Sequence, residues 1–142
     1  NARYLIPLGG MLLGNAITAA TLALERLASD LRTTRGDVQA YLALGATPWQ
    51  AVKPAFHRAV AAALTPTINA MLVVGVVKLP GMMTGQMLGG SSPFQAAMYQ
   101  LLILVGIIVT DMLSAVGVGA LAYRRYFTPA WQIDHEALSR QV

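Results

Sequence analysis

Three long runs of apolar residues constrain this chain more than any other feature of its sequence. Positions 4–24 and 59–77 carry no charged side chain, and positions 97–123 carry only Asp111. Each run is close to the ~20 residues that an α-helix needs to cross the hydrocarbon of a bilayer. The runs are apolar on nearly all sides, whereas the helices of a soluble bundle, the alternative, have a polar face. We therefore predict an all-α integral membrane protein with three transmembrane helices, at about residues 4–25, 57–78 and 97–123.

The distribution of charge predicts the orientation of these spans. Charged residues make up 11% of the chain, against roughly 25% in soluble domains. Half of the ten Lys and Arg residues fall between residues 25 and 58, so the positive-inside rule places the segment 26–57 in the cytoplasm. The loop after the second span then lies outside, and the tail 128–142 is cytoplasmic. The basic residues form no dense run with interleaved aromatics, so we expect no nucleic-acid partner.

Turn and capping signals converge on one corner of the segment 26–57. Gly45 is placed to end a helix in the left-handed conformation. Thr47 then supplies an N-cap, Pro48 a first helical residue and Gln50 a capping-box partner, so two short helices should meet at a fixed corner. Pro54 falls in the second of them and should shorten or bend it.

Several polar or helix-breaking residues lie within the apolar runs. Asp111 is thirteen residues from Arg124, which at 1.5 Å per residue puts it about 20 Å into the bilayer. An ionised carboxylate there costs several kcal/mol unless it is paired, protonated or facing water, so Asp111 is either a pathway residue or a structural partner. Asn15 and Asn69 are candidates for the pathway or for helix packing, and Pro66 should kink the second span, as a static bend or a hinge.

Small residues four apart also recur in two of the spans. They predict close helix contacts, since small side chains let helices approach. The two stripes are Gly10, Gly14 and Thr18, and Gly106, Thr110 and Ser114.

The segment Leu79–Pro93 reads as an irregular outer loop rich in glycine and methionine. Its four glycines and two prolines argue against a continuous helix, yet it carries no charge. Such backbone is tolerated at a membrane where it is buried or lines a cavity, which makes Pro80 and Gly81 pathway candidates. Three methionine thioethers and Asp111 are weak candidates for metal ligands, although methionine more often fills gaps in the packing of an apolar core. The three methionines are Met82, Met83 and Met87.

Catalytic chemistry is missing from the sequence. There is no G-x-x-x-x-G-K-[ST] phosphate loop, so the chain should not hydrolyse ATP, and neither His57 nor His135 has a metal-ligand companion at helical spacing. The absence of cysteine restricts any metal site to oxygen, imidazole or thioether ligands. We expect no enzyme and no bound cofactor.

The corner resembles the EAA loop of ABC transporter permeases, the cytoplasmic coupling helix that docks on the ATP-binding subunit. The segments Gly10–Ala16, Ala63–Thr67, Leu79–Gln86 and Tyr99–Gln100 are together similar to Fet-type iron-export permeases and the related plant aluminium-sensitivity half-transporters. The similarity covers about residues 6–127 and corresponds to the C-terminal half of such a permease.

This resemblance implies a permease domain over residues 1–127 in a bacterial inner membrane, working as a homodimer with a cytosolic ATPase that binds ATP. The cargo would be a metal ion, iron above all, moved outward. An organic solute as cargo and a non-transporting membrane scaffold are the alternatives. The residues expected to couple to the ATPase are Gln39, Tyr41, Leu42, Gly45, Ala46, Thr47, Pro48, Trp49 and Gln50. Gln39 stands where the family pattern has Glu, which puts a charge contact by that residue in doubt.

Overall fold

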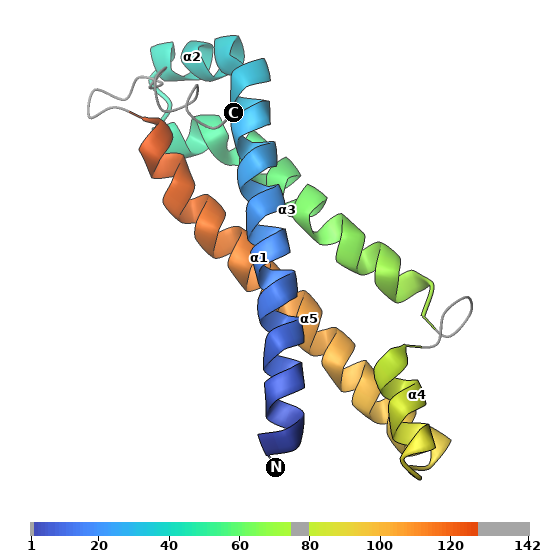
Figure 1. Cartoon of the computed structure of the whole chain (residues 1–142). Coiled ribbons are helices and arrows are strands. Elements are labelled where there is room, and N and C mark those ends of the chain that lie inside the picture. The colour runs from blue at the N-terminus through green and yellow to red at the C-terminus, as the bar shows by residue number, and fades with distance from the viewer. Residues whose placement is uncertain (1, 75–79, 128–142) are drawn as a thin grey trace.

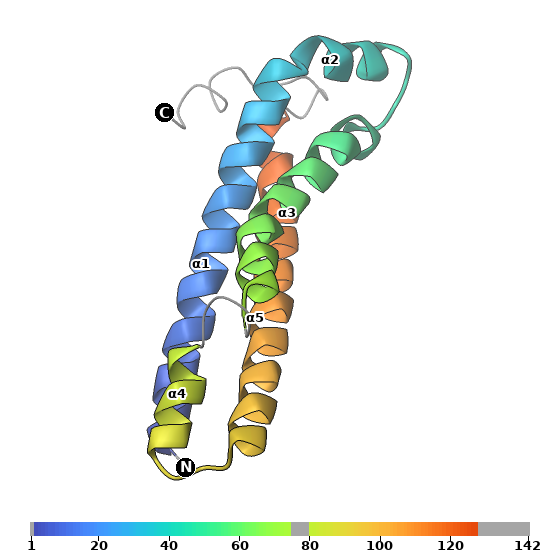
Figure 2. The ribbon, with the colours of Figure 1, turned by 90° about the vertical axis from the view of Figure 1, so that its right-hand side faces the viewer.

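The computed structural model describes residues 2–74 and 80–127, with side chains from residue 6 onward. Three long helices form a bundle, a short helix lies across one end, and another short helix packs at the other end (Figures 1 and 2). No β-strand occurs among these residues, as the all-α prediction requires. In chain order the elements are α1 (Ala2–Thr33), α2 (Arg35–Ala43), α3 (Pro48–Leu72), α4 (Gly81–Leu88), α5 (Pro93–Ala122) and the 3₁₀ helix η1 (Tyr123–Tyr126).

Two of the described helical segments are long and apolar enough to cross a membrane, Ile6–Thr33 and Pro93–Tyr126. They correspond to the first and third predicted spans. The helix α3 is long enough but too polar to meet the same measure, because it carries Lys53, His57 and Arg58 near its start and Asn69 near its end. The apolar residues 75–77 that contributed to the second predicted span lie outside the described residues.

The prediction of two short helices at the corner is wrong for the second of them. The helix α3 starts at Pro48 and continues without interruption through Pro54 and Pro66 to Leu72, bending but not breaking (Figures 1 and 2). Each internal proline removes one backbone hydrogen bond. A buried alanine stripe compensates by packing α3 along its length against α1 and α5; it comprises Ala51, Ala55, Ala59 and Ala63.

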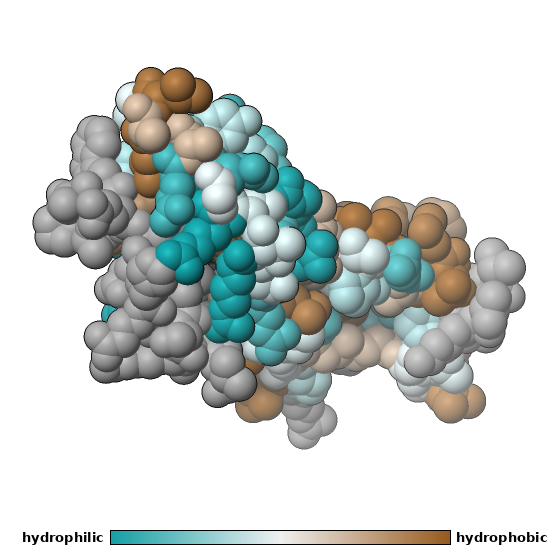
Figure 3. All heavy atoms as spheres, turned by 90° about the horizontal axis from the view of Figure 1, so that it is seen from above, coloured by the Kyte–Doolittle hydropathy of each residue, from teal (hydrophilic) through white to brown (hydrophobic). Residues whose placement is uncertain are grey.

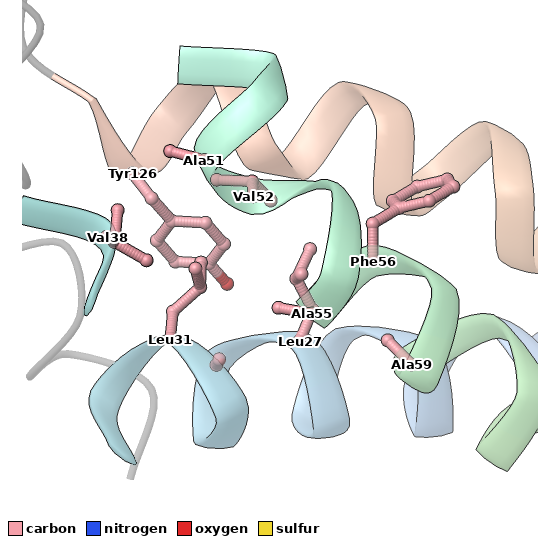
Figure 4. Close-up of a cluster of buried hydrophobic side chains, with 10 residues drawn as sticks. Leu27, Leu31, Val38, Ala51, Val52, Ala55, Phe56, Ala59 and Tyr126 are labelled. Atoms are coloured by element: carbon pink, nitrogen blue, oxygen red, sulfur yellow. The ribbon is translucent and has the colours of Figure 1, made fainter. Parts of the chain in front are cut away.

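The main apolar core lies at the end of the bundle that carries α2, called the α2 end below. Leu27 and Leu31 of α1 and Val52 of α3 are at most 1% exposed, and each contributes about 1.5–3 kcal/mol by leaving water. Figure 4 shows how α1, α2, α3 and Tyr126 of η1 converge on this cluster. Next along the bundle, away from α2, Ala23, Ala63 and Ala115 close the seam between the three long helices. We call these three residues the alanine seam.

Both ends of the bundle are turned by the same local design. At the α2 end, Gly45 has φ +89°, the Gly45 N–H donates to the Leu42 carbonyl and the Ala46 N–H to that of Tyr41. Thr47 then caps α3, because its Oγ1 accepts from the Gln50 N–H (3.3 Å) while its own N–H donates to Gln50 Oε1 (2.9 Å). The predicted C-terminal glycine cap and capping box are therefore both confirmed.

The corner at the other end, the α4 end, was not predicted. Instead of a wholly irregular loop, the segment 79–93 contains the helix α4, which ends at Leu88. Gly90 has φ +90°, its N–H donates to the Met87 carbonyl, and the Ser91 N–H donates to the Gln86 carbonyl. Ser92 then caps α5 through the Gln95 N–H, with Pro93 at the first helical position. Gly89 and Gly90 follow the end of α4, whereas Gly81 and Gly85 lie inside it, so two glycines did not prevent this helix from forming.

The two small-residue stripes behave differently. On α5, Gly106 and Ser114 do face α1, since the Ser114 hydroxyl donates to the Ala16 carbonyl at 2.8 Å. On α1, a Cβ added at Gly10 or Gly14 would meet nothing within 4 Å, so the predicted stripe mediates no close contact among the described residues. The helix α1 packs instead through a neighbouring stripe that includes Ala19, Ala23 and Leu27.

Candidate functional site: a cavity around a buried acid

A cavity of about 470 Å³ lies between α1, α3 and α5 on the side of the alanine seam away from α2. Five of the six predicted pathway or packing residues line it: Asn15, Pro66, Pro80, Gly81 and Asp111. The other residues of its wall are largely apolar. They are Thr18, Ala19, Leu22, Ala63, Thr67, Ala70, Met71, Val73, Val74, Gln100, Leu104 and Ile107.

Four of the predicted site residues lie elsewhere. Asn69 is exposed on α3 and does not line the cavity. The three methionines of α4 are half-buried and also stay outside the wall, so the structure does not bring Met82, Met83 and Met87 together with Asp111. The described residues contain no group of three or more His, Cys, Asp and Glu side chains arranged to hold a metal ion. A thioether–carboxylate metal centre is thus not formed here.

Asp111 is the most distinctive group in the cavity wall. It is 1% exposed, and one carboxylate oxygen, Oδ2, accepts a hydrogen bond from the Thr67 hydroxyl at 2.5 Å. The second oxygen, Oδ1, is buried and accepts no hydrogen bond. Thr67 is therefore a structural partner of Asp111, but it satisfies only half of the carboxylate.

Gln100 is a second buried residue of the cavity wall with an unpaired oxygen atom. Its side chain is 7% exposed, and its Oε1 is buried and also accepts no hydrogen bond. Gln100 and Asp111 are eleven residues apart on α5, which is close to three helical turns, so they share one face about 16 Å apart. Asn15 lines the same cavity, and its Nδ2 donates to the Met11 carbonyl at 2.8 Å.

Sequence reasoning missed both Thr67 and Gln100 as site residues. The three-turn spacing between Gln100 and Asp111 was a usable signal, because polar residues that recur at helical period in an apolar span share a face. No such signal exists for Thr67, since its pairing with Asp111 depends on how α3 crosses α5.

A cluster of ion pairs joins α1 to α3 near the α2 end. Asp30 is 8% exposed. Its carboxylate accepts a hydrogen bond from Arg58 Nε at 2.8 Å and lies 3.3 Å from Arg26 Nε. Arg58 comes from α3 and the other two residues from α1, so this cluster fastens the bundle on the α2 side of the alanine seam. In the sequence these charges predicted only which side of the membrane the segment faces, and not that they pair.

The predicted coupling residues all lie on or beside the corner at the α2 end. Gly45, Ala46, Thr47, Pro48 and Gln50 build the turn and the cap described above, which commits the Gln50 side chain to Thr47. The aromatic ring of Trp49 lies 5.1 Å from those of Phe56 and Tyr123, in tilted and edge-on contacts that hold the first turn of α3 against η1.

The remaining coupling residues lie on α2. Leu42 packs on the apolar core, while Gln39, Tyr41 and the neighbouring Leu44 are exposed, Leu44 by 85%. A second cavity of about 330 Å³ opens between α2 and α3, with Tyr41 and Leu44 in its wall. Seen from this end, a broad hydrophilic area is bordered on one side by hydrophobic side chains (Figure 3). Exposed apolar side chains beside a hollow are a surface that another protein can cover.

Fold and site together define an all-helical protein with two candidate membrane spans and a largely apolar, partly open cavity beside one buried acid. The chain belongs to the family described as "Uncharacterised protein family (UPF0014)", whose profile matches residues 1–127. It is 47% identical over 131 residues to the UPF0014 membrane protein slr1647 of Synechocystis sp., which covers 92% of this chain and 51% of that protein.

Two further relatives carry names that refer to metals. Over 137 residues the chain is 35% identical to the protein ALUMINUM SENSITIVE 3 of Arabidopsis thaliana, covering 96% of this chain and 50% of that one. Over 128 residues it is 35% identical to the probable iron export permease protein FetB of Escherichia coli, covering 90% and 49%. The chain thus spans about half the length of the relatives it matches. No solved structure matches it.

Proposed function

We propose that this chain is part of the permease of an ABC transporter, in which ATP hydrolysed by a separate cytosolic subunit drives a cation, iron in the first instance, out of the cell. The observation that carries the proposal is the cavity around Asp111, at the end of an alanine seam that leads to a rigid corner. The relative named as a probable iron export permease supports both the permease class and the cargo.

The proposed topology places all three long helices across the bacterial inner membrane. The α2 end and the tail 128–142 face the cytoplasm, as the excess of basic residues favours. The helix α3 is the second span in this arrangement. Lys53, His57 and Arg58 lie toward the α2 end, near the aqueous boundary, and Thr67 lies on the cavity wall. In α5 the cavity residues Gln100, Leu104, Ile107 and Asp111 then lie at membrane depth, where a polar pathway needs protein walls.

The proposed contact with the ATPase is the corner formed by α2 and the start of α3. Tyr41 and Leu44 present apolar surface beside the small cavity at the corner, and the two caps fix their position relative to α3. Closure of the ATPase would press on α2 and tilt α3. Two copies of the complete permease would form the transporter, and this chain itself would bind no ATP.

Co-purification tests the class of protein first. The complete permease, solubilised in mild detergent, should bring down an ATP-binding subunit of the ABC type, and Tyr41→Asp together with Leu44→Asp should release that subunit. Gln95→Asp, at the exposed start of α5 and at the opposite end of the bundle, is the matched control and should retain it. A permease that purifies alone, with normal folding, would favour the membrane scaffold over the transporter.

Coupling is tested at Gly45, whose φ of +89° penalises any side chain with a branched Cβ. We expect Gly45→Val to abolish transport-coupled ATPase activity while the protein stays in the membrane. Gly36→Val provides the control, because Gly36 lies within α2, the helix that Gly45 follows, and a Cβ there meets nothing within 4 Å. Normal transport by Gly45→Val would contradict the coupling role.

The cargo is tested by metal content. Cells that lack the intact protein should accumulate iron, and the wild-type gene should restore the normal level. An organic solute is the second candidate, and the largely apolar wall of the cavity favours it. If iron content is unchanged while ATPase coupling is intact, an organic solute becomes the proposed cargo.

A further inference from the structure

We propose that the cavity recognises a cation through hydrogen atoms that the cation donates, at two positions: Asp111 with Thr67, and Gln100. The proposal rests on the function above in taking the cavity as the path of the cargo, and it specifies what that cargo must present. It is carried by two buried oxygen atoms that lack donors, Asp111 Oδ1 and Gln100 Oε1, in the wall of one cavity.

The first step is the sign of the charge. A buried acceptor without a donor costs about 1–3 kcal/mol, so both oxygens are poised to gain from a bound donor. An anion brings only further acceptors and would be repelled by the carboxylate. The cavity-lining residues from α1, α3, α4 and α5 include no other acid and no Lys, Arg or His, so Asp111 faces no competing cation among the described residues. The ion pairs of Asp30 with Arg26 and Arg58 lie outside this cavity.

The second step is the form of the cation. One carboxylate, two hydroxyls and two amide groups, spread along the cavity, are too few to replace the hydration shell of a multivalent metal ion, and no cluster of metal-ligating side chains occurs among the described residues. A metal ion would therefore keep water molecules whose O–H groups donate to these oxygens. An organic ammonium ion offers the same chemistry through its N–H groups, with an apolar body for the wall. The shared requirement is a positive charge surrounded by donor hydrogens.

The third step is the division of labour between the two positions. Thr67 donates to Oδ2 and thereby holds the carboxylate, and Oδ1 remains without a donor. Gln100 carries no charge and lies about 16 Å away, further from the alanine seam. Gln100 is therefore the weaker, neutral binding position, and Asp111 is the charged one. A cation entering past Gln100 would exchange a neutral acceptor for a charged one.

Binding to the purified complete permease in detergent tests the proposal without the ATPase. The probes are Mn²⁺ and n-hexylammonium, added at constant sodium chloride, with binding followed by titration calorimetry and by the rise in unfolding temperature. We expect at least one probe to bind, and sulfate not to bind. Asp111→Asn should weaken binding about tenfold or more, because a charge-assisted hydrogen bond is lost. Asp37→Asn removes an acid from exposed α2 and should leave binding unchanged.

The neutral position has its own matched pair. Gln100→Leu should weaken binding about fivefold, the loss expected for one neutral hydrogen bond, whereas Gln95→Leu on the exposed start of the same helix should not. Thr67→Val should weaken binding and Thr67→Ser should restore it. Binding of Mn²⁺ alone identifies a hydrated metal as the source of the donors, and binding of hexylammonium alone identifies an organic cation; either result supports the shared chemistry.

Three results would overturn the inference. They are binding of neither probe to the wild type, binding that Asp111→Asn leaves intact, and tight binding of sulfate. Thr67→Val and Gln100→Leu keep the test decisive if Asp111→Asn does not fold. If cation binding fails but the ATP-binding subunit still co-purifies, the permease proposal stands, since binding is measured without ATP. Binding without any ATPase partner would leave the site standing and remove the coupling proposal.

Discussion

Replacing Gly119 by alanine should disturb the contact between α5 and the first turns of α3. Gly119 is buried on α5, and a Cβ built on it would lie 2.9 Å from Cε2 and 3.4 Å from Cδ2 of Phe56. Carbon atoms in contact normally lie about 3.5–4.0 Å apart, so the ring must move by roughly 0.6–1 Å. It cannot move freely, because the Trp49 ring lies 5.1 Å from it and contacts Tyr123 in turn.

The expected free-energy change follows from two opposing effects. Overpacking of this kind costs about 1–3 kcal/mol, while alanine is favoured over glycine inside a helix by about 1 kcal/mol. We therefore expect Gly119→Ala to lower the free energy of unfolding by up to about 2 kcal/mol. Gly106→Ala is the control on the same helix, because its Cβ would lie an ordinary 3.6 Å from Leu12. That change should be neutral or stabilise by up to about 1 kcal/mol.

Unfolding by sodium dodecyl sulfate in mixed micelles, followed by tryptophan fluorescence, measures both variants. The chain has two tryptophans, so a Trp131→Phe background makes Trp49 the only reporter. The Gly119→Ala protein should unfold at a lower detergent fraction and show a shifted Trp49 emission. If it proved as stable as the Gly106→Ala protein, with unchanged emission, the close packing of Phe56 on α5 would be refuted.

Three further changes test other parts of the structure. Asp30→Ala should lower the free energy of unfolding by about 1–2 kcal/mol, a value discounted for the half-exposed arginines, and Glu25→Ala should not; equal effects would contradict the role of the cluster. Thr47→Ala and Ser92→Ala should each cost about 1 kcal/mol in the same assay, and no loss in either would disprove its cap. Asp111→Asn should impair transport more than stability, because asparagine can still accept from Thr67; equal loss of both would indicate a structural role.

Local chemistry made the corner at the α2 end predictable. The positive φ of Gly45 and the reciprocal bonds of Thr47 and Gln50 depend on residues within a few positions of one another, and sequence states such relations directly. The same rules, applied to Gly90 and Ser92, would also have revealed the second corner. The content of glycine and proline in the whole segment argued against a helix, whereas the individual positions of Gly90 and Ser92 indicate where a helix ends and the next begins.

Contacts between helices were less accessible. The depth of Asp111 in an apolar run was readable, but its hydrogen bond to Thr67 joins residues 44 apart and depends on the crossing of α3 and α5. The stripe at Gly10 and Gly14 had a pattern typical of close packing, yet α1 uses a neighbouring face. Periodicity identifies a face that can pack, whereas the choice among several such faces is made by the partner helices.

The alanine seam gives α3 the geometry of a lever with a fixed fulcrum. Ala63 lies about 24 Å from Thr47 at one end of the helix and about 14 Å from Leu72 at the other, at 1.5 Å per residue. Because α3 is one continuous helix from Pro48 to Leu72, a sideways displacement at Thr47 would reappear at the cavity reversed in direction and reduced to a little over half. A small-to-large change at the seam, such as Ala115→Leu, would shift this pivot point. It would change the ratio of the displacements at the two ends of α3 without altering a residue of the cavity wall or the corner.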